Sequence, residues 1–272
     1  MPELPEVETL RRALLPLIPG KRLATLKFYR PDLRFPIPTE TLTQTLTGAV
    51  LSDITRIGKY LLLHFSGGAM LWHLGMSGRV EQAPSLTPIH KHDHAAFHFE
   101  PDIYLHFVDP RRFGCILWVP DGKGHPLIDH LGPDPLVPTT TAKDLKARAR
   151  TCKGPIKGFL MNATRLAGIG NIYACESLHA ALIHPNRPAN KLTLPQWETL
   201  LATLRVTLEK SIASGGTTLR DFFSADGTPG YYTIDLAVYG RENQPCKQCG
   251  SPIVRTVHSG RSTFFCRACQ KR

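Results

Sequence analysis

Four cysteines near the C-terminus have a spacing that suits a metal site. They form two C-x2-C pairs separated by sixteen residues: Cys246, Cys249, Cys266 and Cys269. Tetrahedral zinc needs four ligands, and each pair can offer two thiolates to one ion. Disulfide bonds are the alternative, but nothing in the sequence indicates an oxidising compartment. The spacing therefore predicts one structural zinc ion per chain, whereas Cys115, Cys152 and Cys175 lack such partners and should be packed thiols.

The residues between the two cysteine pairs predict a β-hairpin. The stretch "IVRTVHSGRSTFF" has Ser259-Gly260 at its turn and Arg261 directly after it, which would hold one guanidinium toward a phosphate or a groove. The tail has few apolar residues, so the metal should supply its folding free energy. Residues 241–272 also contain seven Lys and Arg against one acid.

The opening stretch "MPELPEVETLRR" places a proline and several acids where chemistry is possible. A small second residue such as Pro2 allows removal of the initiator Met, and an N-terminal amine can act as a nucleophile. The same stretch also predicts an amphipathic helix that ends before Pro19-Gly20, with acids in the first turn to suit the helix dipole. On the pattern alone, Glu3 and Glu6 fit either explanation.

Four histidines in "HKHDHAAFH" are a second candidate cluster. On a strand, His90, His92, His94 and His98 would share one face and could form another metal site.

The elements that must position these residues change in type along the chain. Short aromatic or β-branched runs predict strands up to about residue 120, and an antiparallel sandwich or barrel is the expected packing. They are "LATLKFY", "KYLLLHF", "AMLWHLG", "AAFHFE", "IYLHFV" and "CILWV". Residues 132–141, "GPDPLVPTTT", predict an interdomain linker. Beyond it the periodicity is helical over 171–182 and 198–216, with Thr193 and Gln196 as a capping box.

Length and charge narrow the class of protein. The chain has 272 residues, room for two compact domains, and carries 33 Lys and Arg against 22 Asp and Glu, a net charge of +11. Such a balance favours a polyanionic partner, most simply nucleic acid, over a merely solvated basic surface. Apolar runs long enough to span a membrane and signal-peptide features are both missing from the sequence, so we expect neither a membrane-spanning nor a secreted protein. A non-enzymatic zinc-ribbon protein that binds nucleic acid is one function compatible with these features.

Several motifs occur in a diagnostic order. They are "PELPEVE", "GKYLLL", "HLGMSG", "KHDH", "DPRRFG", "GIGNIYACESL", "GGTTLRDF", "VYGR" and the cysteine hairpin. Over essentially the whole chain, this set resembles the bacterial formamidopyrimidine-DNA glycosylases. The related endonuclease VIII enzymes, which act on oxidised pyrimidines, share the N-terminal proline and the zinc hairpin. They typically open with Pro-Glu-Gly-Pro-Glu and lack "LGMSG", which makes them the closer alternative.

The resemblance implies an α+β multidomain fold. Residues 1–135 would form a catalytic β-sandwich domain with an N-terminal helix, 136–240 a helix–two-turn–helix domain that binds DNA, and 241–272 a zinc β-hairpin finger. It also implies a monomeric enzyme of base-excision repair in the bacterial cytosol. Its partner would be damaged double-stranded DNA, from which it removes 8-oxoguanine and formamidopyrimidines before cleaving the strand by β,δ-elimination.

By the same resemblance, the catalytic residues lie at the N-terminus. Pro2 would attack the sugar C1′ and form an iminium, Glu3 would protonate the opening sugar ring, and Glu6 would orient the site. Lys59 corresponds to a lysine that contacts phosphate at the lesion.

The resemblance also implies a set of DNA contacts. Met76, Arg111 and Phe113 would fill the gap left by the extruded base, with Arg111 donating to the orphaned cytosine. His92 would lie on a DNA-adjacent strand that holds no metal, and residues 215–232 would close over the base. Phosphate contacts are expected from His73, Asn171, Tyr239 and Arg261. At Asn162-Ala163 the chain departs from the family pattern, which puts contacts of that segment in doubt.

Overall fold

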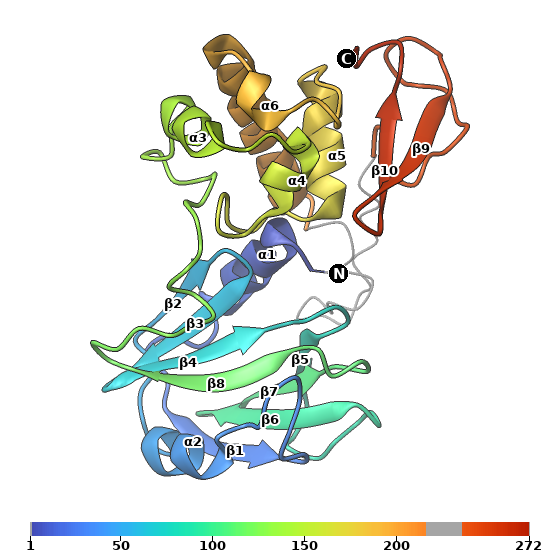
Figure 1. Cartoon of the computed structure of the whole chain (residues 1–272). Coiled ribbons are helices and arrows are strands. Elements are labelled where there is room, and N and C mark those ends of the chain that lie inside the picture. Colours follow the sequence, from blue (N-terminus) through green and yellow to red (C-terminus); the bar gives the residue numbers. More distant parts are fainter. Residues whose placement is uncertain (1, 216–235, 272) are drawn as a thin grey trace. The chain divides into compact units, whose positions relative to one another are not determined.

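The computed structural model describes residues 2–215 and 236–271 (Figure 1). The chain divides into two compact units: one contains the residues up to Asp129, and the other contains His130–Ser211 and the C-terminal hairpin. Among the described residues, the helices are all too short or too polar to cross a membrane.

The first unit is a sandwich of two antiparallel sheets. One sheet has the order β1-β6-β7-β5, from β1 (Leu23–Phe28), β6 (Asp93–Phe99), β7 (Ile103–Val108) and β5 (Arg79–Ala83). The other has the order β2-β3-β4-β8, from β2 (Asp53–Ile57), β3 (Tyr60–Phe65), β4 (Gly68–His73) and β8 (Cys115–Pro120). Two helices, α1 (Leu4–Leu14) and α2 (Thr39–Leu46), complete the unit. The expected sandwich with an N-terminal helix is confirmed.

The two sheets share one apolar core. Trp72 of β4 lies with its ring centroid 5.1 Å from that of Phe97 in β6 and 6.0 Å from that of Phe107 in β7. Apolar side chains of α1 and α2 belong to the same buried cluster. All six predicted strand runs form strands, but β2 and β5 were not anticipated. Their sequences, "DITRI" and "RVEQA", are short and half polar, so pairing with β3 and β7 rather than local propensity makes them strands.

The second unit is mainly helical. It contains α3 (Ala142–Ala149), α4 (Ile156–Met161), α5 (Asn171–Ala180), a short 3-10 helix (Ala189–Lys191) and α6 (Leu194–Ala213). Trp197 of α6 is fully buried with its ring 5.2 Å from that of Phe159. The predicted helices α5 and α6 are confirmed, and the Gln196 side chain accepts the N–H of Thr193 at 2.9 Å, as a capping box requires.

The segment expected to be a linker is a packed part of the second unit. The guanidinium of Arg205 in α6 donates to the carbonyl oxygens of Pro135 (2.7 Å), Val137 (3.1 Å) and Thr140 (2.7 Å). Leu136 packs against the helical core. The prolines and threonines prevent regular secondary structure here, but the segment is packed and is not a flexible linker.

The C-terminal hairpin has the predicted geometry. Strands β9 (Ile253–His258) and β10 (Arg261–Cys266) pair antiparallel, and the turn residues Ser259 and Gly260 have φ values of 49° and 72°. Two consecutive positive φ angles match the right-handed strand twist, and glycine adopts them without strain. The four cysteine sulfurs at the base of the hairpin lie within 4.8 Å of one another. Four converging thiolates fit a tetrahedral zinc ion, so the donor set agrees with one structural zinc.

The hairpin is also attached to the helices of the second unit. Lys157 in α4 is 2% exposed, and its Nζ donates to the carbonyl of Ser262 (2.9 Å) and to Thr263 Oγ1 (2.7 Å). Phe264 belongs to a buried cluster with Cys175 of α5. These contacts add to whatever zinc contributes, and the dependence of the tail's folding on the metal stays a prediction.

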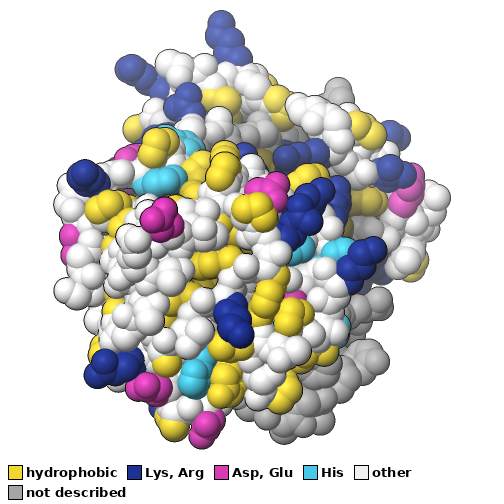
Figure 2. Space-filling view, turned by 90° about the horizontal axis from the view of Figure 1, so that it is seen from below, with side chains coloured by type: hydrophobic (Ala, Val, Ile, Leu, Met, Phe, Trp, Pro, Cys, Tyr) yellow, Lys and Arg dark blue, Asp and Glu magenta, His cyan; other side chains and the backbone are white. Residues whose placement is uncertain are grey.

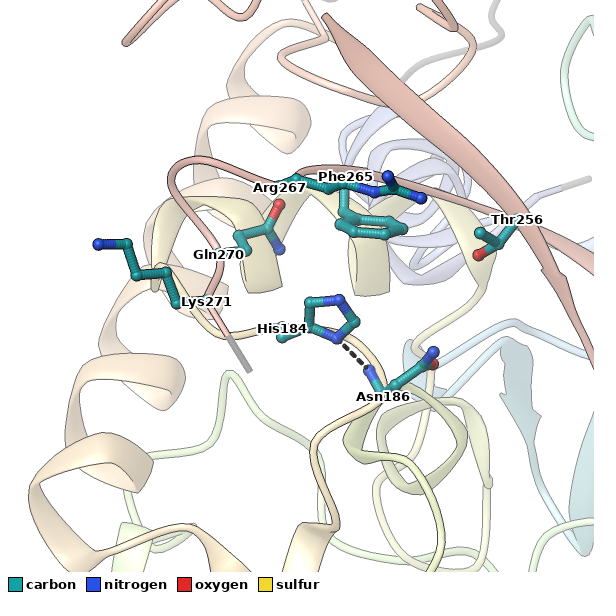
Figure 3. Close-up of a pocket in the computed structure, with 7 residues that line it drawn as sticks. All are labelled: His184, Asn186, Thr256, Phe265, Arg267, Gln270 and Lys271. Carbon is teal, nitrogen blue, oxygen red and sulfur yellow. Dashed lines mark hydrogen bonds between the residues drawn. The ribbon is translucent and has the colours of Figure 1, made fainter. Parts of the chain in front are cut away.

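Beside the cysteine cluster, the hairpin and the turn after α5 enclose a pocket of about 400 Å³ (Figure 3). The rings of Phe265 and His184 meet edge to face there, 4.7 Å apart, and Gln270 donates to the carbonyl of Ile183 at 2.9 Å. These contacts hold the segment that carries Cys266 and Cys269 against the helical core.

A buried carboxylate attaches α1 to the sandwich. Glu8 accepts hydrogen bonds from Arg11 (2.8 Å) and Arg12 (2.9 Å) of its own helical segment and from Arg56 of β2 (3.0 Å). Burial alone would raise the pKa of Glu8, but hydrogen bonds from the three guanidinium groups outweigh it and lower the pKa to about 2.

We predict that Glu8→Gln lowers the free energy of unfolding at pH 7 by about 3 kcal/mol, because the buried guanidinium of Arg56 and the partly buried one of Arg11 lose their counter-charge, as does the exposed Arg12. The folded pKa lies below the ordinary value of 4.5, so the stabilisation is complete above about pH 4.5 and disappears as the pH falls toward 2. Urea unfolding followed by circular dichroism of the sheets should show the difference in unfolding free energy between Glu8→Gln and the original chain becoming smaller below pH 4.5. Glu40→Gln, at an exposed acid of α2, is the control and should change little.

We predict that the purified protein contains one zinc ion and that Cys249→Ser loses it. Removal of one of four thiolates leaves an incomplete tetrahedral site. Metal analysis measures the zinc content, and trypsin should cut the variant faster at the exposed Arg255 and Arg261. Cys152→Ser, which removes a thiol outside the cluster, should retain zinc. Full zinc occupancy in Cys249→Ser would contradict the four-ligand site.

Candidate functional site

The start of α1 brings together a secondary amine and two buried acids. Pro2 is half-buried, while Glu3 and Glu6 are only 1% and 3% exposed. The Glu6 carboxylate accepts the N–H of Glu3 at 2.8 Å, in a capping box that fixes the first turn. The predicted nucleophile, general acid and orienting acid therefore lie in one rigid turn, beside the positive end of the helix dipole.

A basic cluster surrounds the end of β4. His73 pairs with Tyr60 across the sheet, with ring centroids 4.6 Å apart, and Lys59 lies in the turn just before β3. Burial first, and then the charges of Lys59 and Arg34, lower the pKa of His73 to about 4. His73 is thus neutral at pH 7. Its Nδ1 accepts the N–H of Gly75 at 3.0 Å, so the proton lies on Nε2, which can donate to an anion.

Sequence reasoning missed Arg34, and no motif marks it. It comes near His73 because the loop after β1 folds back onto the β7–β8 turn, where the Arg34 N–H donates to the carbonyl of Gly114 at 3.0 Å. Its guanidinium is exposed beside the ring of Phe35.

Two turns carry the three residues predicted to enter the duplex. Met76 lies between β4 and β5 and is 39% exposed, and Phe113 lies between β7 and β8 and is 44% exposed. The Arg111 guanidinium carbon lies 5.0 Å from the centre of the Phe113 ring. All three side chains are therefore accessible in the free protein, as their predicted role requires.

The four histidines of "HKHDHAAFH" do not share one face, which corrects that expectation. His90 and His92 precede β6, and a bulge between Asp93 and Ala95 shifts the register of the strand. His94 is buried and donates to the carbonyl of Asp109 at 2.8 Å. His98 stacks on Tyr104, with ring centroids 4.4 Å apart. The rings of His92 and His94 lie 6.3 Å apart, but no three of these histidines converge on one point. The cysteine cluster is the group among the described residues that could hold a metal ion.

In the second unit, the predicted phosphate contacts meet around the hairpin. Asn171 is the first residue of α5, and its Nδ2 donates to the carbonyl of Ser262 at 2.9 Å. Arg261 is exposed at the hairpin turn and lines a pocket of about 370 Å³ together with Lys157 and His258. Tyr239 lies against Phe264, with ring centroids 5.0 Å apart. A helix N-terminus flanked by an exposed arginine is suited to an anion.

Glu176 of α5 holds the segment that carries Tyr239. Its carboxylate accepts the N–H groups of Ala237 (2.7 Å), Val238 (2.9 Å) and Tyr239 (2.8 Å). No sequence signal identifies this role, because the helical pattern presents Glu176 only as one acid in a buried helix.

Two further expectations concern segments beside these residues. The Asn162 side chain accepts from the N–H (2.9 Å) and the hydroxyl (2.8 Å) of Thr164, so this departure from the family pattern forms a local turn after α4. The loop expected over 215–232 lies, from residue 216 on, outside the described residues.

The net charge of +11 alone does not locate the site. On the face shown in Figure 2, basic and acidic side chains are interspersed with apolar ones, rather than gathered into a single basic field. A local group of basic side chains, such as Lys59, Arg34 and His73, therefore indicates the position of the site better than the net charge of the whole chain does.

Three family models match consecutive parts of the chain. They are the formamidopyrimidine-DNA glycosylase N-terminal domain over residues 1–116, the formamidopyrimidine-DNA glycosylase H2TH domain over 131–223, and a zinc finger found in FPG and IleRS over 243–272. Curated relatives named formamidopyrimidine-DNA glycosylase from Acidithiobacillus ferrooxidans and Xanthomonas oryzae are each 46% identical over 100% of both chains.

Solved structures agree with these matches. The FPG protein of Thermus thermophilus is 38% identical, with a TM-score of 0.86 over 99% of this chain and 98% of that one. A complex between an FPG mutant from Lactococcus lactis and a Fapy-dG containing DNA is 32% identical, with a TM-score of 0.89 over 100% of both chains. With family models along most of its length and relatives that match it from end to end, this chain belongs to the formamidopyrimidine-DNA glycosylase family.

Proposed function

We propose that this protein removes oxidised purines, 8-oxoguanine and formamidopyrimidines, from duplex DNA and then cleaves the strand at the resulting abasic site. The observation that carries this proposal is the N-terminal turn, in which Pro2 precedes the buried Glu3 and Glu6, in a chain 46% identical over its full length to formamidopyrimidine-DNA glycosylases. A Lactococcus lactis relative has been solved with DNA that contains an abasic site, which supports the second step.

The proposed chemistry begins at the Pro2 nitrogen. Its lone pair attacks C1′ of the damaged nucleotide, the bond from C1′ to the base breaks, and the base leaves with the proton that the Pro2 nitrogen gives up. The C1′–O4′ bond then breaks as O4′ is protonated, and the nitrogen lone pair forms the C1′=N bond. Because the amine is secondary, the resulting iminium is cationic and withdraws electrons from C2′. Loss of a C2′ proton then expels the 3′ phosphate, and a second elimination expels the 5′ phosphate. Hydrolysis of the remaining iminium returns the free amine.

Glu3 is proposed as the general acid that protonates the sugar ring oxygen as the ring opens. Its near-complete burial beside Pro2 supports this role, since a proton held there is not exchanged directly with bulk water. Glu6 is proposed to orient the turn through the N–H of Glu3.

The first unit is proposed to contact the lesion strand and the gap in the duplex. Lys59 would neutralise a phosphate, and His73 would donate through Nε2. Met76, Phe113 and Arg111 would fill the space of the extruded base, and their exposure in the free protein supports this. His92, at the start of the neighbouring strand, would lie beside the DNA.

The second unit is proposed to bind phosphates through Asn171, Tyr239 and Arg261. The zinc ion would act only structurally, holding the hairpin so that Arg261 projects from its turn. The proposed domains are 1–135, 136–240 and 241–272. The three matched family models support their order, while residues 131–135 fall within the H2TH match and in the second compact unit.

We further propose that the protein acts as a monomer in the bacterial cytosol, where chromosomal DNA lies.

Neither of the two alternative functions that the sequence leaves open is favoured. An endonuclease VIII-like preference for oxidised pyrimidines finds no support in the N-terminal match, which is to a formamidopyrimidine-DNA glycosylase domain. A zinc ribbon that only binds nucleic acid does not account for the buried acids at the N-terminus.

The nucleophile is tested by borohydride reduction on an 8-oxoguanine:cytosine duplex. We expect a covalent protein–DNA adduct only from chains that begin at Pro2, because an acylated proline nitrogen has no basic lone pair. Mass spectrometry identifies the first residue. Glu3→Gln should excise the base about 10²–10⁴-fold more slowly and still cleave a preformed abasic site. Trapping by a chain that retains Met1 would move the nucleophile to Lys59, and no cleavage by the intact protein would overturn the proposed activity.

The contact with the opposite strand is tested by Arg111→Ala. A guanidinium that donates to cytosine should contribute about 1–3 kcal/mol of discrimination, so the preference for cytosine over adenine opposite 8-oxoguanine should fall about tenfold or more. Single-turnover excision from both duplexes measures it. Arg150→Ala, at an exposed arginine after α3, is the matched control and should retain the preference. An unchanged ratio in Arg111→Ala would remove this residue from the role.

A further inference from the structure

Asp109 lies at the start of the turn between β7 and β8 and is fully buried. We propose that Asp109, acting largely through Ser77, is a positioning residue that fixes the 74–78 turn, the 109–114 turn and the entrance to β6 relative to one another. These segments carry Met76, Arg111, Phe113 and His92. The effect that we expect on DNA recognition rests on the proposed function, whereas the hydrogen bonds themselves do not.

One hydroxyl connects the first two turns. Ser77 Oγ donates to Asp109 Oδ1 at 2.7 Å and accepts the N–H of Arg111 at 3.1 Å. The second carboxylate oxygen, Oδ2, accepts the N–H of Gly114 at 2.8 Å. The Asp109 side chain therefore bridges the turn that carries Met76 and both ends of the turn that carries Arg111 and Phe113.

The backbone of Asp109 connects the third segment. Its N–H donates to the carbonyl of His92 at 3.1 Å, and its own carbonyl accepts from His94 Nε2 at 2.8 Å. The same carbonyl accepts the N–H of Arg112 at 3.1 Å, and Arg112 has a φ of 58°. A left-handed conformation is unfavourable for arginine, so this turn holds its shape only because the surrounding bonds determine it.

The two turns also touch without intervening side chains. A Cβ at position 75 would lie 2.3 Å from the carbonyl carbon of Phe113, and one at position 114 would lie 2.6 Å from the carbonyl oxygen of His73. Glycine at both positions permits this approach. Neither turn can therefore shift alone, and the Asp109–Ser77 bond sets the register in which they meet.

Ser77 is a better test position than Asp109, because loss of the buried carboxylate could unfold the unit. Ser77→Ala removes only the bridging hydroxyl, and Ser77→Thr keeps a hydroxyl at a half-buried position. Ser52→Ala is the matched control, since it removes a serine hydroxyl that donates to the carbonyl of His64 in the same unit.

The first measurement is amide hydrogen exchange in the free protein. Ser77→Ala should raise the exchange rates of residues 74–78 and 109–114 together by about tenfold, while Ser77→Thr and Ser52→Ala behave like the original chain. Faster exchange in the 74–78 turn alone would overturn the proposed connection. This readout does not depend on enzymatic activity, so it separates failure of the inference from failure of the proposed function.

The second measurement is the ratio of single-turnover excision rates for 8-oxoguanine opposite cytosine and opposite adenine. Ser77→Ala should lower that ratio about tenfold, because Arg111 and Phe113 would no longer be held in one arrangement, and Ser77→Thr should restore it. A uniform loss of rate on both duplexes, with the ratio unchanged, would show that the bond serves only stability and would overturn the positioning role.

Discussion

Buried carboxylates in the first two turns of α1 must be matched by hydrogen-bond donors, and this requirement fixes the N-terminal proline. A carboxylate removed from water costs several kcal/mol unless donors or cations compensate it. Glu8 meets the requirement with three guanidinium groups, one of which comes from β2, and Glu6 meets it with a backbone N–H at the start of the helix. The helix is thus attached to the sandwich by charge as well as by its apolar face. Pro2, which has no partner strand of its own, takes its position from that attachment.

Buried carboxylates also hold the loops that carry the proposed DNA contacts. Asp109 and Glu176 are both buried, and each carboxylate accepts hydrogen bonds from short segments that lie outside the regular strands and helices. Loops are ordinarily the most mobile parts of a fold, whereas a binding surface requires side chains in defined positions. A buried carboxylate can satisfy several backbone N–H groups at once, so it orders such a segment with a single residue. Tyr239 and Arg111 both depend on this arrangement.

The features that the sequence predicts well are local. The spacing of the cysteines, the Ser259-Gly260 turn and the apolar runs of six strands each depend on neighbouring residues, and all of them appear in the structure. The features it misses depend on distant partners. The strand β2 is polar and becomes a strand through β3, while segment 132–141 is packed because Arg205 donates to its carbonyls. The shared face that strand alternation predicts for the four histidines is absent because one bulge in β6 breaks that alternation. The roles of Arg34, Asp109 and Glu176 likewise follow from tertiary contacts that no motif records.

The net charge of the chain does not describe the charge at the proposed site, where one of three basic side chains is neutral. His73 lies near Lys59 and Arg34, and its burial together with those two charges keeps its pKa at about 4. A third cation in this cluster would add repulsion in the free protein, whereas a neutral imidazole adds none. The salt dependence of DNA binding counts only the cations that replace counterions at phosphates. His73 would therefore contribute a directional hydrogen bond from its Nε2–H rather than a charge, and Lys59 would supply the electrostatic attraction. In this basic protein, the His73 ring stays uncharged first because it is buried and then because of the lysine and arginine beside it.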